Sequence, residues 1–355
     1  MIKKLFALLL ALALLLCGCT AKAPETQPTE TAAPKEKPRS VGICLPDFSW
    51  SEQADRLCAL LEEAGCQVYL EYASSDVQLQ QSQVQTLVNM PVGCLLVAAI
   101  DSMSLVDVLA AAREDQVPVI ALDRMLTYTD AVVGCVAVDH YEAGRLLGSH
   151  IVAEKKLETA QKPVTIEFFM GAPENHSSLL LYQGVMEQLR PYLQSGILQC
   201  RSGRTAFEDT CIQEETTEAA SDRCFDYITE FYTDKAPDVL CAATDPLAAG
   251  CISALFSFGM GPKDEDWSLV VSSGGTQDGI ANILQYYQSI TLYADPEVLA
   301  DQCVQWALAA IDGTLPTGQT MFNGVSEVST FLLKPIVIGL DNYKDAYKED
   351  PAEES

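Results

Sequence analysis

The chain has 355 residues, of which 48% are hydrophobic, so it can bury a large core as one domain or as two lobes. Its 49 acidic and 22 basic residues give a formal net charge of -27. A charge of this sign repels phosphate backbones and anionic lipid surfaces, which excludes nucleic acid as an expected partner.

The N-terminus has the features of a bacterial lipoprotein signal. Two lysines precede an apolar run over residues 5–16 that is too short to span a membrane. The sequence LCGC at residues 16–19 resembles the lipobox, whose last cysteine is lipidated and becomes the mature N-terminus. We therefore predict a lipoprotein signal segment over residues 1–19, lipidation at Cys19, and a place on the outer face of the cell membrane. An ordinary signal peptide or an uncleaved anchor is the alternative.

Two further segments are expected to lie outside the folded part. Residues 20–40 are rich in Pro, Thr, Ala, Glu and Lys and have no apolar period, which predicts a disordered tether. Residues 348–355 form an acidic tail that we expect to be solvated. The only membrane contact that the sequence predicts is the lipid anchor.

The centre of the chain predicts a β-α-β unit of a parallel sheet. Residues 92–100 and 117–122 are continuous apolar runs, as strands buried on both faces require, and residues 105–113 between them have helical apolar spacing. Ligands of open parallel sheets bind beyond the carboxyl ends of the strands. The polar residues that follow predicted strands here are Asp101, Asp123, Arg124, Asp139 and His140.

The same alternation runs along the rest of the folded part and predicts an α/β protein with doubly wound parallel sheets. Further strands are predicted at 41–46, 66–72, 163–169, 196–200, 239–243, 267–272 and 331–338. Further helices are predicted at 51–64, 76–89, 142–155, 179–193, 218–232, 247–259 and 296–311.

The ordered motifs SVGICLP, AAIDSMSLVDVLAAA, VPVIALDR, VAVDHYEAG and FLLKPIVI resemble the extracellular solute-binding proteins of sugar ABC transporters, specifically the xylose and multiple-sugar receptors, over residues 40–347. The resemblance implies the type I periplasmic binding protein fold, in which a hinge joins two lobes around a ligand cleft. The implied N-terminal lobe is 41–141 plus about 295–318, and the C-terminal lobe is 142–294 plus about 319–347. The implied function is capture of a monosaccharide and its delivery to the permease.

The resemblance also implies contact residues, some of which this chain has replaced. The first strand-end loop lacks the lysine and arginine of the family and retains aromatic side chains that suit a pyranose face. The aspartate of a Gln-Asp pair and a later lysine fall opposite Gly274 or Gly275 and Ala294. The candidate ligand-binding residues are Asp47, Phe48, Trp50, Asp101, Asp123, Arg124, Asp139, His140, Glu174, Asn175, His176 and Asp245.

Two of the three histidines, His140 and His176, occupy positions where the resembled receptors carry asparagine. We expect both to face the cleft, one from each lobe. The acidic neighbours that we expect near them favour protonated histidine or a cationic ligand group. These expectations predict that ligand binding depends on pH.

The thirteen cysteines do not indicate a disulfide framework. Cys17 and Cys19 belong to the signal region, and the eleven others are an odd number that includes several in apolar strands. We expect buried free thiols. No Cys/His spacing indicates a metal site.

The sequence contains no HExxH, GxSxG or Walker motif, and we expect neither an enzyme nor a cofactor. A binding protein needs only a cleft lined with hydrogen-bonding side chains. Two alternatives remain: a degenerate interaction protein whose partner is a membrane sensor, and a binding protein for a nucleoside or a cationic solute.

Overall fold

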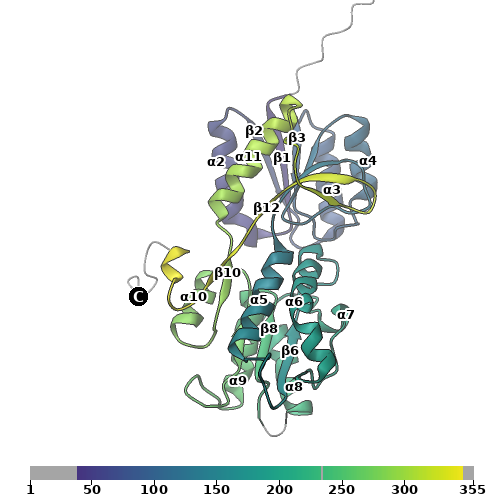
Figure 1. Ribbon diagram of the computed structural model, residues 1–355. Helices are drawn as coiled ribbons and strands as arrows, with labels where there is room; N and C mark the ends of the chain where they lie inside the picture. The colour runs from purple at the N-terminus through teal and green to yellow at the C-terminus, as the bar shows by residue number, and fades with distance from the viewer. Residues whose placement is uncertain (1–37, 233–234, 347–355) are drawn as a thin grey trace, which may run out of the picture. The chain divides into compact units, whose positions relative to one another are not determined.

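The computed structural model describes residues 38–232 and 235–346, and Figure 1 shows its course. The predicted signal segment, Cys19, residues 20–37 of the tether and the acidic tail lie outside the described residues. Ser40, the last residue of the predicted tether, is the first residue of a strand. None of the described helices is both long and apolar enough to cross a membrane.

The first sheet has seven strands in the order β11-β12-β5-β4-β3-β1-β2. All neighbours are parallel except β11 and β12. The strands are β1 Ser40–Leu45, β2 Gln67–Tyr72, β3 Cys94–Val97, β4 Val119–Leu122, β5 Val132–Val138, β11 Thr320–Phe322 and β12 Glu327–Leu333. The elements that accompany this sheet are η1 Phe48–Trp50, α2 Ser51–Glu63, α3 Val77–Val88, α4 Val106–Glu114 and α11 Pro296–Asp312.

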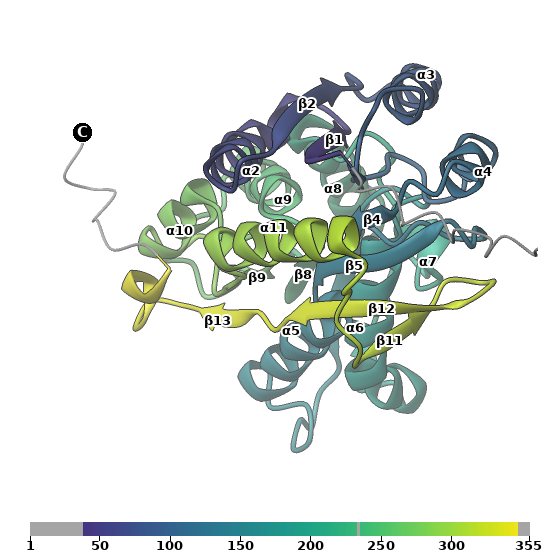
Figure 2. The same cartoon turned by 90° about the horizontal axis from the view of Figure 1, so that it is seen from above.

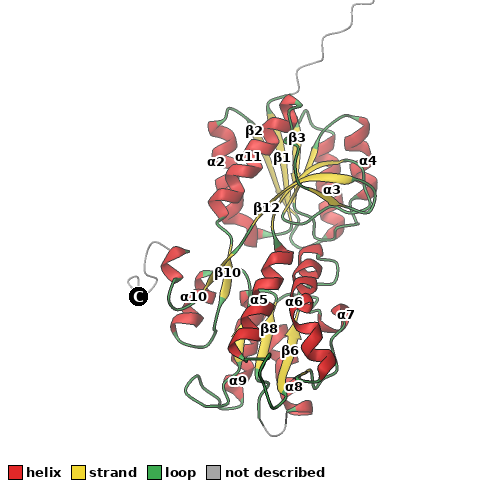
Figure 3. Ribbon diagram, in the orientation of Figure 1, coloured by secondary structure: helices red, strands yellow, loops and turns green. Residues whose placement is uncertain are grey.

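Helices cover both faces of this sheet, as Figure 3 shows. Because successive side chains of a strand point to opposite faces, a strand buried on both faces divides its residues between two cores. In β3, Cys94 and Leu96 pack in one core with α2 and α11, whereas Leu95 and Val97 pack in the other with α3 and α4. The doubly wound arrangement predicted from the continuous apolar runs is confirmed.

The second sheet has four parallel strands in the order β7-β6-β8-β9, and it packs in a single large core. Its strands are β6 Val164–Phe169, β7 Leu198–Gln199, β8 Val239–Ala242 and β9 Leu269–Val271. Its helices are α5 His140–Glu154, α6 His176–Ser195, α7 Phe207–Thr210, α8 Thr217–Phe231, α9 Asp245–Ser257 and α10 Gln277–Leu284. An antiparallel pair, β10 Thr291–Tyr293 with β13 Ile336–Ile338, lies beside it, and the 3-10 helix η2 Tyr343–Asp345 follows.

Within the described residues the chain passes three times between the parts of the molecule built on the two sheets: after β5, after β10 and after β12. Figure 2 shows β12 and β13 following one another in line. The assignment of residues 319–347 to the C-terminal lobe needs correction, because β11 and β12 belong to the first sheet. The strand predicted over 331–338 is two strands in different sheets. Pro335, which has no N–H to donate, separates them.

Helices α5 and α6 pack so closely that two glycines are required. A Cβ atom on Gly144 would lie 2.0 Å from the carbonyl oxygen of Leu181, and one on Gly184 would lie 2.1 Å from that of Tyr141. Further along α5, a Cβ on Gly148 would lie 2.7 Å from Cβ of Gln188, so the contacts advance along both helices together and the helices run in the same direction. Their first residues, His140 and His176, therefore lie at the same end of the pair.

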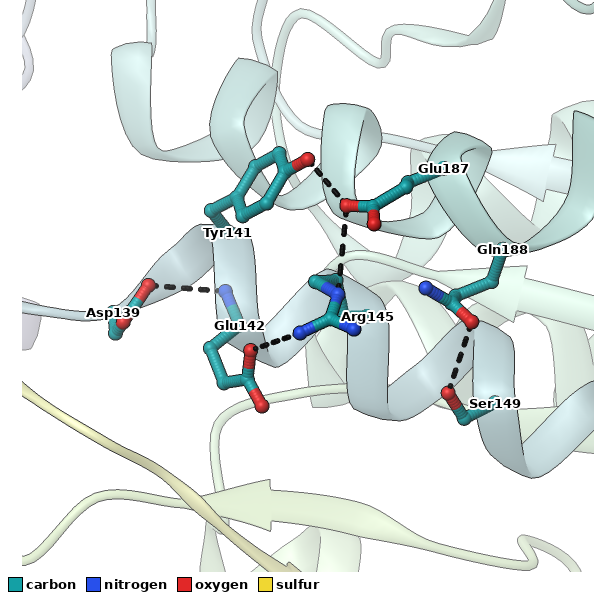
Figure 4. A network of polar contacts seen from close by, with 7 residues as sticks. All are labelled: Asp139, Tyr141, Glu142, Arg145, Ser149, Glu187 and Gln188. Carbon is teal, nitrogen blue, oxygen red and sulfur yellow. Dashed lines mark hydrogen bonds and ion pairs between the residues drawn. The ribbon is translucent and has the colours of Figure 1, made fainter.

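Polar contacts join the exposed sides of the same two helices, as Figure 4 shows. The hydroxyl of Tyr141 donates to the Glu187 carboxylate, and Nε of Arg145 lies 3.4 Å from the same carboxylate. Ser149 donates to Gln188 over 3.3 Å. Such contacts between exposed groups fix the register of the two helices more than they stabilise the fold.

The eleven cysteines of the described residues are all free thiols, as expected from the sequence. Nine are buried, and Cys58 and Cys200 are partly exposed. Burial raises the pKa of Cys241 to about 12, so this thiol stays protonated and packs as a small hydrophobic side chain.

Candidate functional site

The carboxyl ends of β4 and β5 place Asp123 and His140 together. Asp123 has a left-handed backbone (φ 56°), and its Oδ1 accepts from the N–H of Val138 at 3.2 Å. The same oxygen lies 2.8 Å from Nε2 of His140. The exposed fractions of the two side chains are 27% and 16%. No described residue donates to Oδ2 of Asp123, so this oxygen can accept from a ligand hydroxyl.

The electrostatics of the pair keep Asp123 ionised. Burial alone would raise its pKa, but the charge and hydrogen bond of His140 and the N–H of Val138 outweigh burial and hold the pKa below its usual value. Asp123 is therefore an acceptor throughout the neutral range.

Arg124 and Trp50 form the second part of the site. The Arg124 guanidinium carbon lies 5.9 Å from the centre of the Trp50 ring, a cation–π contact. Nη1 of Arg124 donates to the carbonyl oxygen of Ala99 at 3.1 Å. This single bond orients the guanidinium and leaves its other N–H groups for a ligand.

Trp50, Asp123 and His140 line a cavity of about 240 Å³, and Arg124 is not among its lining residues. It is smaller than the roughly 300–1,000 Å³ of pockets for drug-sized ligands, so it suits a smaller molecule. Elements of both sheets contribute to it. Its lining residues are Trp50, Gln53, Leu57, Leu122, Asp123, Val136, Val138, His140, Ser273, Gly274, Leu292, Ala294, Pro296, Leu299, Ala300, Cys303 and Pro335.

The two predicted histidines meet at a second, smaller cavity of about 60 Å³, which Asp123 and Asp139 also line. Burial, and then the nearby charge of His140, lower the pKa of His176. The expectation that the local field favours a protonated histidine is therefore wrong for His176. The expectation from the sequence left out two causes: the burial of His176 and the nearby charge of His140.

The expectation that the histidines come from different lobes also needs correction, because α5 begins at His140 and packs with α6. His140 lines both cavities, whereas His176 lines the smaller one.

Asp245 is enclosed rather than open to a ligand. It is 1% exposed, and its carboxylate accepts from several buried donors. Both Gly274 and Gly279 approach it, and a Cβ on Gly279 would lie 2.4 Å from Oδ2. The donors are the hydroxyls of Ser272, Thr276 and Thr291, the Thr276 N–H and the Gln288 amide. Asp245 holds the strand ends of the second sheet together and lines neither cavity.

Two other predicted residues act as helix caps. Asp139 accepts from the N–H of Glu142 at 3.0 Å and begins α5. Asn175 accepts from the N–H of Ser177 at 3.1 Å and begins α6, and its amide donates to Glu215 at 3.2 Å. These bonds satisfy backbone groups that a helix start leaves without partners.

The carboxylates of Asp101 and Glu174 likewise accept hydrogen bonds from other groups of the chain. Neither residue lines either cavity. The Asp101 side chain accepts from the N–H of Met103 at 2.8 Å. Glu174 accepts from the amide of Gln213 at 3.0 Å, and its backbone oxygen accepts from Ser102 at 3.3 Å.

The remaining two predicted residues lie in the first loop and outside both cavities. The Asp47 carboxylate accepts from Ser49 and, at 2.7 Å, from Ser75. Phe48 is 70% exposed and stacks on Tyr72 at 4.5 Å between ring centres. Trp50 is thus the aromatic side chain of this loop that lines the larger cavity.

Ser177 and Gln53 were missed by sequence reasoning. The hydroxyl of Ser177 donates to the backbone oxygen of Asp123 at 2.9 Å, which ties α6 to the end of β4. Gln53 lines the larger cavity from the first turn of α2. A position one helical turn beyond the strand-end loop is the signal that could have indicated Gln53.

The chain resembles known proteins over nearly its whole folded length. Residues 42–315 match the family model described as periplasmic binding protein domain. The multiple sugar-binding periplasmic protein SbpA of Azospirillum brasilense is 30% identical over 92% of this chain and 92% of its own. The multiple sugar-binding periplasmic receptor ChvE of Rhizobium radiobacter is 28% identical over 87% and 89%.

A solved structure is similar to the same extent. An ABC transporter solute-binding protein from Clostridium phytofermentans, with bound beta-D-glucose, is 30% identical and superposes with a TM-score of 0.84. The match covers 89% of this chain and 100% of that protein. These matches confirm the predicted two-lobed fold. The proteins that the chain matches are binding proteins rather than enzymes.

Proposed function

Because the chain belongs to the periplasmic binding protein family, we propose that it captures a monosaccharide outside the cytoplasm and delivers it to an ABC transporter permease. Sugar as the ligand class is supported by relatives named as sugar-binding proteins and by the glucose bound to the Clostridium protein. The observation that carries the proposal is the cavity of about 240 Å³ that contains Trp50, Asp123 and His140.

The chemistry of these side chains suits a neutral sugar. Ionised Asp123 accepts from a sugar hydroxyl through Oδ2, and Arg124 beside it donates to hydroxyl or ring oxygens. The Arg124 guanidinium covers one face of the Trp50 ring, and the edge of the ring beside it offers an apolar surface to the sugar. Contacts from both lobes at once would favour the closed arrangement, since a ligand shifts a conformational equilibrium by its differential affinity.

We further propose that lipidation at Cys19 anchors the protein and that residues 20–39 hold the folded part away from the membrane. The support is the sequence alone: a short apolar segment, the LCGC motif and a polar stretch rich in proline.

Titration calorimetry of the purified protein with D-glucose, D-xylose and myo-inositol tests the proposed ligand class, alongside a nucleoside and a cationic amine. A saturable heat with a sugar, and a matching rise in melting temperature, is the expected result. Binding of the nucleoside or the amine, without binding of any sugar, would replace sugar by that compound as the proposed ligand class. No binding of any probe would favour the interaction protein with a membrane sensor as partner.

A further inference from the structure

A further cavity, of about 400 Å³, lies on the part of the molecule built on the second sheet and shares no lining residue with the candidate sugar site. The end of α8 and the loop after β7 form it. Its lining residues are Arg204, Arg223, Asp226, Tyr227, Thr229 and Glu230. Two arginines in one cavity are unusual in a chain with a formal charge of -27.

Neither arginine is neutralised by a carboxylate. The Arg204 guanidinium carbon lies 5.3 Å from the centre of the Tyr227 ring, and the guanidinium makes no hydrogen bond to a described residue. Arg223 donates through Nη1 to the backbone oxygen of Cys211. Among the described residues, no ion pair involves either side chain. Most of their N–H groups are therefore available to a ligand.

The hydroxyl of Tyr227, which also lines this cavity, has no hydrogen-bond partner among the described residues. The residue is 3% exposed, and no described group hydrogen bonds to its hydroxyl. Burial raises the pKa of Tyr227, and the opposing influence of Arg223 and Arg204 is smaller, so the hydroxyl keeps its proton. A buried hydroxyl without a partner is costly, and this one can donate to an acceptor that enters the cavity.

Hydrogen bonds to a buried carboxylate hold the loop that carries Arg204 in place. Glu167 of β6 is fully buried and accepts from the N–H of Ser202 at 3.0 Å and from its hydroxyl at 2.6 Å. The Tyr232 hydroxyl donates to the same carboxylate at 2.7 Å. The turn before Arg204 is thus fixed before any ligand binds, which lowers the entropy lost on binding.

We propose that this cavity binds a small oxyanion of the phosphate and sulfate class. Two guanidinium groups and a tyrosine hydroxyl are the donors that such an anion requires, and guanidinium groups match its oxygens in bidentate geometry. Asp226 and Glu230 at the cavity repel an anion and limit the affinity. The proposal does not depend on the sugar-binding function.

The experiment measures binding of inorganic phosphate, and in parallel of sulfate, to the full-length chain by calorimetry at constant ionic strength. We expect saturable binding of at least one of the two anions that D-glucose does not displace. Arg204→Gln and Arg223→Gln should each weaken the binding at least tenfold, whereas Asp226→Asn should strengthen it. Arg113→Gln is the matched control, because Arg113 is an exposed arginine paired with Asp130 at 2.7 Å.

Tyr227→Phe distinguishes a binding site from a structural cluster. Because the hydroxyl has no partner, this variant should be at least as stable as wild type without phosphate and should bind phosphate or sulfate more weakly. The proposal is overturned if neither anion binds saturably, if Arg113→Gln weakens binding as much as the two cavity variants, or if Tyr227→Phe leaves the affinity unchanged.

Discussion

At the scale of single residues, a strand-end carboxylate is available to a ligand only if local donors do not occupy it. Asp123 and Asp245 both follow strands of parallel sheets. One oxygen of Asp123 is occupied and the other is open, whereas both oxygens of Asp245 accept from buried groups. The first can bind a hydroxyl, and the second stabilises the fold.

Arg124→Ala should weaken sugar binding by about 2–4 kcal/mol, because a charge-assisted hydrogen bond in a desolvated cleft is lost. The variant should stay folded, since the guanidinium makes one hydrogen bond to the backbone and one ring contact. Titration calorimetry with D-glucose, supported by circular dichroism, checks both statements.

Arg113→Ala is the control for that measurement, because it removes an exposed ion pair with Asp130 on the same part of the molecule. Its sugar affinity should equal that of wild type. Equal affinity in folded Arg124→Ala would place the ligand contacts elsewhere.

Stability should fall in mild acid partly through His176. Its folded pKa is lowered by burial and then by His140, whereas the unfolded side chain titrates near 6.5. Between these two values the unfolded chain binds more protons, so the free energy of unfolding decreases as the pH drops below about 6.5. Urea denaturation at pH 7.5 and 5.5 should show a smaller decrease for His176→Asn than for wild type. An equal decrease would contradict the assignment.

The pH dependence of ligand binding stays a prediction. His140 shares Oδ1 of Asp123, so its protonation changes the donors that a ligand meets. Calorimetry between about pH 5.5 and 8 should give a sloping affinity for wild type and a flat one for the double variant His140→Asn, His176→Asn. A flat profile in both proteins would exclude a role for the histidines.

At the scale of elements, the close packing of α5 on α6 positions the site. Both helices begin at the strand ends, with His140 and His176 as first residues, and the two glycines set their separation. The close approach of α5 at Gly144 and Gly148 is to α6.

Gly184→Ala should destabilise the protein by about 1–3 kcal/mol, because the added methyl group would overlap the backbone of α5. Since α5 would move, sugar affinity should fall as well. Gly318→Ala is the matched control, because a Cβ there meets no atom within 4 Å. Urea denaturation of both variants measures the difference. A Gly184→Ala protein as stable as the control would show that the helices can separate without cost.

At the scale of the whole molecule, three chain crossings connect the parts built on the two sheets, and all three bring residues to the cavity. Val138 and His140 lie on either side of the first crossing, Ala294 and Pro335 lie at the second and third, and all four line the cavity. A ligand in this cavity is therefore in contact with the segments about which the two parts would move, which is the arrangement of hinge closure.

Cys19→Ser should release the protein from the membrane, because a lipid chain supplies the anchoring that a short apolar segment and a polar tether lack. Fractionation of cells that express wild type or variant measures the distribution. Cys17→Ser is the matched control, since this cysteine lies two residues earlier in the same segment. Unchanged membrane association of Cys19→Ser would remove the lipoprotein assignment.

The sequence by itself determined the alternation of strands and helices and the strand-end positions of Asp123, Arg124 and His140. Apolar period and helix-start residues depend on neighbours a few positions apart, which a sequence displays directly. The first residues of helices were harder to predict from the sequence. Helices α5 and α6 begin at His140 and His176, two and three residues before their predicted starts.

Only the tertiary structure decided which strand ends share a cavity and which polar groups are already satisfied there. Asp245 accepts from Thr291, 46 residues away, and Ser177 donates to Asp123, 54 residues away. That β12 belongs to the first sheet likewise depends on its pairing with β5. Such contacts follow from sheet order and helix packing between distant segments, and no local pattern of residues encodes them.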